Sequence, residues 1–368
     1  MIKLQIIEKE EDFYSLQPSW DFLCNAVGNS LFSGFDWCYT YWSSMRPGQL
    51  AILVFKDGQE VVGIIPLVTK RKIAKCYEFL GGAYADYHEF LILPGYQEDC
   101  FQLLRDFLRG KYFSFHNVVG DSPADQFLKS YDIRSTIFST KEELAPFINI
   151  DCSWEQYLQR LKKRLLQDTR RQLKHLKKVG ELEFVTATTP EEINILLNLL
   201  GEFKEKRRYT DIVARNPIDQ PARRLFLFNI ARLLAGNEAL DLCLLKVGGR
   251  PVAVHLSFIF KKKYYYYIPS FSEEFRTYSV GRLLMLYSME KAFGSGLKEF
   301  DFLIGGEPYK FDWATGQRRL FSLVNYPAPP LGIALKFWDE KLYPWAANNR
   351  FLRAVRKRAL NSIHGKLP

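Results

Sequence analysis

The sequence predicts an α/β (α+β) fold in two parts, each a mixed, mostly antiparallel sheet flanked by helices. At 368 residues the chain is longer than one ordinary core needs, so two domains are expected. Strand and helix patterns alternate along both halves. The 47% of hydrophobic and 25% of charged residues are typical of a globular protein, and the 15% of aromatic residues suit large sheets.

We expect an N-terminal domain over residues 1–150, a second domain over 151–330 and a basic, aromatic tail over 331–368. The net charge of +10 is unevenly divided. Residues 1–150 carry 14 Lys/Arg against 19 Asp/Glu, a net charge of −5, whereas residues 151–368 carry 37 against 22, a net charge of +15. An anionic ligand or surface is therefore expected on the second half.

The six cysteines are scattered along the sequence and form no C-x-x-C pair. This pattern predicts neither a disulfide framework nor a zinc site, so no metal is expected, and it suits a reducing compartment. Met1 is not followed by a basic-then-apolar leader, and no stretch approaches ~18 uninterrupted apolar residues. We therefore expect a cytoplasmic protein without a membrane span.

The first half is expected to contain a hairpin, further strands and a helix. Residues 51–55 and 61–69 have strand patterns on either side of a turn at 56–59. A polar break at 85–88 separates two later strand patterns. The remaining predicted elements are strands at 78–82 and 89–93, and a helix at 100–110 that stops at a glycine.

Three helices open the second half. Ser153 with Gln156 is a capping-box signature, and the helix region that it starts runs to about residue 179. The next helices are predicted from Thr189 to about residue 206, and over 221–235. Strands at 239–247, 251–260 and 263–270 then form an antiparallel meander, followed by a helix at 280–294 and a buried strand at 298–304.

The turn at 276–282 lies between the meander and the helix at 280–294. Small residues in such a turn let the backbone approach a ligand closely, and a helix N-terminus adds partial positive charge. Arg276 and Arg282 flank the turn. An ordinary capped helix start is the plain alternative to the pyrophosphate site that these features suit.

The turn resembles the acyl-CoA pyrophosphate loop of GNAT enzymes, R/Q-x-x-G-x-G/A, with Ser279 in place of the first glycine. Residues 301–310 resemble the D-x-x-x-G-x-E-x-Y-K run of the CelD/BcsL-like GNAT group of cellulose and exopolysaccharide biosynthesis, which is related to the Fem peptidoglycan aminoacyltransferases. Segments at 32–42, 62–67 and 85–90 also look like that group, and the resemblance covers about residues 30–330.

The resemblance implies tandem GNAT-like domains, with acyl-CoA bound by the second and an acceptor-side first domain without cofactor. It implies transfer of an acetyl or acyl group to an amine, such as an amino sugar or polysaccharide precursor in envelope biosynthesis. A Fem-like aminoacyl-tRNA-dependent transferase and a non-catalytic GNAT-like binding protein of a polysaccharide synthesis system remain open. The implied cofactor-binding residues are Arg276, Ser279, Val280, Gly281 and Arg282.

Amide formation from a thioester needs a base for the amine and a proton source for the leaving thiolate. Glu307, after a diglycine, is the first candidate for base or substrate binder, or else a surface ion pair. Tyr309 is a candidate donor to sulfur, or a packing residue. Asp301 and His255 lie on apolar strands, where structural pairing and a core role compete with catalysis.

Acceptor binding is assigned to the polar residues Asp86, Tyr87 and His88 of the first half, although a loop that caps a strand explains them nearly as well. Lys310 is expected to bind a phosphate or carboxylate rather than to act as base. Trp37 and Trp42 are expected in the core rather than stacked on a sugar.

Within the helix region after Ser153, residues 160–178 hold nine Lys/Arg against one acid, Asp168. It is either a solvated face or the contact for a phosphorylated acceptor or tRNA, and Arg171 is its candidate substrate-binding residue. Interruptions at Gly180 and Pro190 argue against the long coiled coil of Fem proteins, so tRNA is not favoured. The basic residues are Arg160, Lys162, Lys163, Arg164, Arg170, Arg171, Lys174, Lys177 and Lys178.

The tail at 331–368 mixes large aromatic side chains with a run of arginines and lysines. It can lie on anionic lipid at the inner membrane face, or pack on the domain with its basic side in water. The sequence leaves both interpretations open. The residues concerned are Trp338, Trp345, Phe351, Arg353, Arg356, Lys357 and Arg358.

Overall fold

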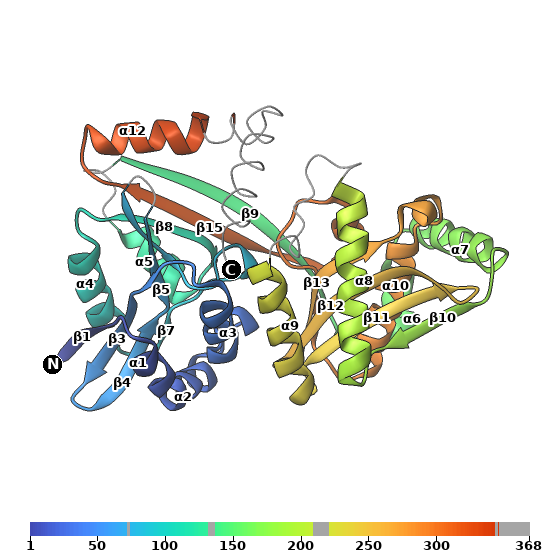
Figure 1. Cartoon of the computed structure of the whole chain (residues 1–368), viewed down its shortest axis with the longest axis horizontal. Coiled ribbons are helices and arrows are strands. Elements are labelled where there is room, and N and C mark those ends of the chain that lie inside the picture. The colour runs from blue at the N-terminus through green and yellow to red at the C-terminus, as the bar shows by residue number, and fades with distance from the viewer. Residues whose placement is uncertain (72–73, 132–136, 209–220, 343–344, 346–368) are drawn as a thin grey trace, which may run out of the picture.

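The computed structural model describes residues 1–71, 74–131, 137–208, 221–342 and 345. Figure 1 shows two lobes side by side, bridged by two long strands, β9 (Ile137–Asn149) and β15 (Gly316–Tyr326). Within the described residues, no helix is long and apolar enough to cross a membrane.

The strands form two sheets of mixed but mostly antiparallel pairing. The smaller has four strands in the order β1-β3-β4-β7, and all of its pairs are antiparallel. Their bounds are β1 (Ile2–Ile7), β3 (Ile52–Asp57), β4 (Glu60–Ile65) and β7 (Leu91–Ile92).

The larger sheet runs through both lobes with eleven strands in the order β10-β11-β12-β13-β14-β9-β15-β8-β6-β5-β2. Only the pairs β13–β14 and β6–β8 are parallel among its named strands. The remaining bounds are β2 (Gln49–Leu50), β5 (Leu67–Arg71), β6 (Lys75–Phe79), β8 (Tyr112–Val119), β10 (Leu182–Thr186), β11 (Leu240–Val247), β12 (Arg250–Phe260), β13 (Lys263–Phe271) and β14 (Glu299–Asp301).

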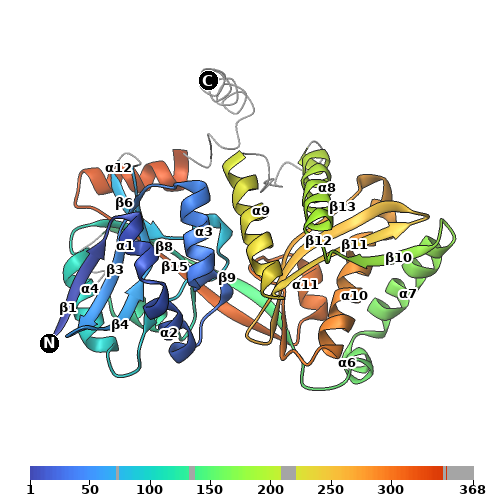
Figure 2. The same ribbon diagram turned by 60° about the horizontal axis from the view of Figure 1, so that its bottom comes forward.

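Helices cover both faces of the sheet in the second lobe. Helices α8 and α9 lie on one face, and α6, α7 and α10 lie on the other (Figure 2). The bounds are α1 (Glu10–Ser15), α2 (Gln17–Val27), α3 (Phe35–Met45), α4 (Gln97–Leu108), α5 (Pro123–Ser130), α6 (Trp154–Arg160), α7 (Lys163–Lys177), α8 (Pro190–Arg208), α9 (Pro221–Gly236), α10 (Val280–Gly294), α11 (Pro308–Trp313) and α12 (Leu331–Phe337).

The predicted elements of the second half are largely confirmed. The capping box at Ser153 is present, because its side chain accepts from the N–H of Gln156 while the Gln156 side chain bonds back. The three meander strands pair in antiparallel order, and α10 has the predicted bounds.

Several predicted elements differ from the structure. The strands predicted at 78–82 and 89–93 lie at 75–79 and 91–92, and the helix predicted at 100–110 lies at 97–108. The basic helix region is broken at Leu161, where the backbone is extended, so it forms α6 and α7. The strand at 61–69 breaks at Pro66 into β4 and β5, where the chain passes from the small sheet to the large one. The strand at 298–304 ends at Asp301, whose carboxylate accepts from the N–H of Leu303 at 2.8 Å and turns the chain.

Aromatic side chains hold the two lobes together. Trp37, on α3, meets three rings of the second lobe edge-on, those of Phe226, Phe258 and Tyr267, at centroid distances of 5.3 to 5.6 Å. Trp42 is also buried, so the prediction that both tryptophans belong to the core is confirmed.

The domain boundaries at 150 and 330 remain a proposal. Strand β15, from the predicted second domain, pairs with β8 and β9 of the predicted first domain, and one continuous sheet joins them. Of the tail, α12, η4 (Trp338–Leu342) and Trp345 are described, whereas Phe351 and the basic residues after it lie outside the described residues.

Candidate active site

The backbone of the turn at 276–282 leads from β13 into the N-terminus of α10. Strand β13 leads into η3 (Glu273–Tyr278), and Ser279 then takes a left-handed conformation with φ 54° and ψ 37°. The side chain of Ser279 makes no capping bond, and no hydrogen bond is recorded for the N–H groups of Val280 and Gly281 among the described residues. These two donors and the helix dipole make the turn suitable for an anion.

A cavity of about 750 Å³ lies against this turn. All five predicted cofactor-binding residues line it, together with Glu307, Tyr309, Lys310 and Asp86. It lies where the parallel pair of β13 and β14 separates, since β14 ends at Asp301 while β13 continues to Phe271. Its apolar walls come from both sides of that opening: Tyr266, Tyr267, Pro269 and Phe271 on one side, and Phe302, Leu303 and Ile304 on the other.

An ion pair lies at one end of the cavity. The Lys310 ammonium is 3.0 Å from Oε2 of Glu307 and donates to the carbonyl of Ile304 at 3.0 Å. Lys310 is buried, while 56% of the Glu307 side chain is exposed. Gly305 makes this arrangement possible, because a Cβ there would lie 2.1 Å from Glu307 Oε2 and 2.7 Å from Lys310 Nζ.

Asp86 enters the same cavity from the first lobe. Burial raises the pKa of its carboxyl to about 7, and the Asp301 carboxylate acts in the same direction. The Lys310 ammonium and the Ile304 N–H lower the pKa of Asp86, but by less than burial raises it. A carboxyl group with a pKa near neutrality is suited to accepting a proton at physiological pH.

Asp301 lies behind the cavity and is not among the residues that line it. Its fully buried carboxylate accepts from the hydroxyl of Tyr87 at 2.7 and 2.9 Å and is paired with Arg318 at 2.9 Å. Arg318 also pairs with Glu299. The structure therefore places Asp301 and Tyr87 in a buried network next to the site rather than in contact with a ligand.

His255 is also outside the set of cavity-lining residues. It lies inside the lobe, where its Nε2 is 2.9 Å from Ser288 Oγ and 3.2 Å from Tyr264 Oη. Burial lowers its pKa to about 4, so the ring is neutral near pH 7. Edge-on packing against Tyr266, which does line the cavity, is its link to the site.

The side chains of Asp241, Cys243 and His255 bring three ligand-type atoms within 4.8 Å of one another. Asp241 already has a cationic partner, because Lys291 Nζ lies 2.6 Å from its Oδ1, and its Oδ2 accepts from Tyr264 at 2.7 Å. The donor set therefore fits a bound metal poorly while Lys291 holds the carboxylate.

His88 lies in the core of the first lobe. Its ring stacks on Phe79 with centroids 4.6 Å apart, and its Nδ1 is 2.8 Å from the carbonyl oxygen of His116. Burial lowers its pKa to about 4. His88 does not line either of the two cavities described, so of the three predicted acceptor contacts only Asp86 reaches one.

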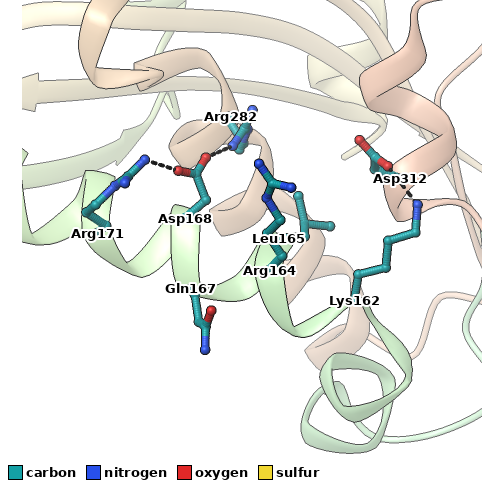
Figure 3. A pocket seen from close by; sticks show the side chains of 8 residues that line it. All are labelled: Lys162, Arg164, Leu165, Gln167, Asp168, Arg171, Arg282 and Asp312. Carbon is teal, nitrogen blue, oxygen red and sulfur yellow. Dashed lines mark hydrogen bonds and ion pairs between the residues drawn. The ribbon is translucent and has the colours of Figure 1, made fainter.

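A second cavity, of about 690 Å³, lies between α7 and the N-terminal turn of α10. Asp168 is paired with Arg171 at 2.5 Å and with Arg282 at 2.9 Å, and Asp312 is 3.3 Å from Lys162 (Figure 3). Four cations against two carboxylates make the cleft basic, and Arg282 lines both cavities. The lining residues are Lys162, Arg164, Leu165, Gln167, Asp168, Arg171, Arg282 and Asp312.

Sequence reasoning missed several lining residues. Lys204 comes from α8, and Tyr266 and Tyr267 come from β13. The sequence of the Tyr-rich strand 263–270 predicts a strand and nothing more. Its tyrosines line the cavity because the neighbouring strand β14 ends beside them, and the sequence of β13 does not show where β14 ends.

Comparison with known proteins agrees with this architecture. A family profile described as an acetyltransferase (GNAT) domain matches residues 162–311, which contain the turn, both flanking strands and the 301–310 run. No curated protein sequence matches the chain.

Solved structures of three relatives cover nearly the whole chain. FemX is 14% identical over 86% of this chain and 96% of its own, with a TM-score of 0.56. L-PGS from Bacillus licheniformis is 10% identical, and the match covers 89% of this chain and 96% of L-PGS, with a TM-score of 0.55. A tandem GNAT protein from the clavulanic acid biosynthesis pathway is 11% identical, and the match covers 88% of this chain and 98% of that protein, with a TM-score of 0.51. At such identities the likeness shows the fold alone, which is of the GNAT type.

Proposed function

We propose that this chain is an acyl-CoA-dependent N-acyltransferase whose donor site is the cavity at the turn 276–282. The observation that carries the proposal concerns the N–H groups of Val280 and Gly281 at the start of α10. They have no hydrogen-bond partner among the described residues, and both residues line that cavity. A Cβ at Gly281 would be 3.2 Å from the Phe271 ring, so the glycine lets the start of α10 pack closely on this wall of the cavity. The apolar opening beyond it suits the thioester arm.

In the proposed reaction, Asp86 accepts a proton from the acceptor amine as its nitrogen attacks the thioester carbonyl. The C–N bond forms and the C–S bond breaks, and the departing thiolate takes a proton from the hydroxyl of Tyr309. Asp86 suits the first step because its pKa of about 7 leaves it partly ionised near neutral pH. Glu307 and Lys310 are proposed to bind the acceptor from the other side of the cavity.

The basic cleft is proposed to hold a second phosphate group of the same donor. Arg282 lines both cavities, so a donor with phosphates at two places can contact it along its length. Arg171 and Arg164 supply the further charge. For the acceptor, we propose an amino sugar or polysaccharide precursor, on the sequence resemblance of residues 301–310 alone.

Calorimetry with acetyl-CoA tests the donor. Wild-type protein is expected to bind it, and Gly281→Asp to lose binding, because a carboxylate would lie at the phosphate position. Gly281→Ala separates the contribution of charge from that of the added Cβ. Dephospho-CoA lacks the phosphate on the ribose. Wild type is expected to bind it more weakly than CoA, whereas Arg164→Ala is expected to bind the two ligands equally. Absence of CoA binding by the wild type would refute the proposal.

One observation favours a second candidate, an aminoacyl-tRNA-dependent transferase. Helix α7 and the residue that caps its C-terminus expose several cations besides those in the cleft, namely Lys163, Arg170, Lys174, Lys177 and Lys178. Such a surface binds RNA with an affinity that falls steeply with salt. Tight, salt-sensitive tRNA binding without CoA binding would favour this candidate over the first.

A further inference from the structure

A cluster of exposed apolar side chains lies along α12, η4 and Trp345, which we call the α12 face. Its most exposed members are Trp345 at 61%, Ile333 at 59% and Phe337 at 55%. Of the fifteen large hydrophobic residues exposed among the described ones, six lie in the thirteen positions of this segment. The six are Leu331, Ile333, Phe337, Trp338, Leu342 and Trp345.

The inner side of the same segment is fixed to the first lobe. Leu335 is buried, and Gly332 packs so tightly that a Cβ would lie 1.9 Å from the carbonyl oxygen of Pro327. Lys336 donates to the carbonyl of Phe138 at 2.8 Å. Asp339 accepts from the hydroxyl of Tyr112 at 2.8 Å.

These contacts decide which side of the segment faces outward. The polar side chains Lys336 and Asp339 reach inward for partners, while the large apolar ones point to solvent. Residues 331–342 therefore pack on the domain through Leu335 on their inner side, while the apolar side chains of their outer side stay exposed. Figure 1 shows α12 along one edge of the first lobe, on the outside of β9 and β15.

The neighbouring sequence indicates what the face binds. Residues 346–368 contain six Lys/Arg and no Asp/Glu. An apolar surface rich in Trp, Phe, Leu and Ile, followed directly by concentrated positive charge, matches the interface of an anionic bilayer, where rings enter the headgroup layer and cations meet phosphate. A protein partner of similar size would not need this uniform charge.

We propose that the α12 face docks the protein on an anionic lipid surface. Ile333, Phe337 and Trp338 enter the headgroup region, and the charge that follows in the sequence strengthens the contact. This inference is independent of the donor assignment, because the α12 face and the two cavities share no residue.

Vesicle co-sedimentation tests the proposal with the full chain. Vesicles of phosphatidylglycerol and phosphatidylcholine are expected to bind the wild type, and vesicles of phosphatidylcholine alone to bind at least tenfold less. The double variant Ile333→Ser/Phe337→Ser is expected to lose at least tenfold in affinity for the anionic vesicles. Both side chains are exposed, so the fold is expected to be unaffected, which circular dichroism checks.

The matched control is Ile195→Ser/Leu225→Ser, which removes two exposed apolar side chains from α8 and α9. It is expected to bind vesicles like the wild type. Equal binding by the Ile333/Phe337 variant, or no binding by the wild type at low salt, overturns the proposal. A wild-type dimer in light scattering that the Ile333/Phe337 variant abolishes also overturns it, because the face would then join two copies.

Discussion

The hydroxyl of Tyr87 donates to the carboxylate of Asp301 at 2.7 Å across 214 residues of sequence. Tyr87 follows Asp86, the one lining residue that the first lobe gives to the donor cavity. Asp301 ends β14 and begins the segment that leads to Glu307. This contact therefore links the segment that carries the proposed base to the segment that carries the ion pair of Glu307 and Lys310.

Arg318 is expected to contribute strongly to stability because it neutralises two buried carboxylates, Asp301 and Glu299. Arg318→Met leaves both without their main partner, and we expect the free energy of unfolding to fall by about 3–5 kcal/mol. Arg319→Met is the control, since Arg319 and its partner Glu142 are exposed. Urea denaturation measures both, and equal effects of the two variants would contradict the assignment.

Asp86 should govern the pH dependence of the rate. If its carboxylate is the base, kcat/KM rises with pH and levels off above its pKa of about 7. Asp86→Asn is expected to lower kcat by about 100-fold and to lose that rising limb, at a donor affinity close to that of the wild type. A pH profile unchanged in the variant would remove Asp86 from the chemistry.

The same pKa shift predicts an effect on stability with the opposite trend. The pKa of Asp86 in the folded protein is raised above its ordinary value of 3.8. Its contribution to stability is therefore complete below pH 4 and is lost as pH rises through about 7. The melting temperature of Asp86→Asn relative to wild type should increase between pH 4 and 7 and then remain constant, which thermal denaturation in a buffer series measures.

Ser279 has a left-handed backbone that a glycine adopts more readily. Ser279→Gly should raise the free energy of unfolding by up to about 1 kcal/mol without weakening donor binding. Ser279→Val should lower both, because a β-branched side chain is poorly tolerated there. Calorimetry and denaturation on the same preparations measure the two effects, and a stabilising valine would show that the turn is not strained.

Gly305 lies directly beneath the pair of Glu307 and Lys310. Gly305→Ala should displace both side chains, since the added Cβ would lie 2.1 Å from Glu307 Oε2. We expect kcat/KM for the amine to fall by about tenfold while donor affinity is kept, as for a misplaced substrate contact. Gly306→Ala, where a Cβ meets no atom within 4 Å, should behave like the wild type.

The sequence predicted most of the second lobe because its signals are local. The capping box at Ser153 and the meander with its turn at Gly248 and Gly249 each specify their own structure within a few residues. The end of β14 was not predictable in the same way. It depends on the Asp301 side chain, which bonds the N–H of Leu303 and holds that residue at φ 61°.

The candidate site could be predicted only in part, for a related reason. The turn 276–282 is contiguous in sequence, and its five predicted residues line one cavity. Lys204 and Tyr267 join them through the packing of α8 on β13, which no local pattern encodes. His255 differs again, because its strand position was predicted while its bonds to Ser288 and Tyr264 depend on the tertiary fold.

The place of β15 in the large sheet constrains the order in which the chain can fold during synthesis. It lies between β8 and β9, so those two early strands lack a shared neighbour until residue 326 has left the ribosome. The neighbour of β9 on its other side, β14, also comes late in the sequence. A nascent first lobe therefore carries one unpaired edge on β8 and two on β9 while most of the second lobe is being translated, and such edges invite pairing with other chains. The longer this part of the chain waits for β14 and β15, the longer those edges stay open to aggregation.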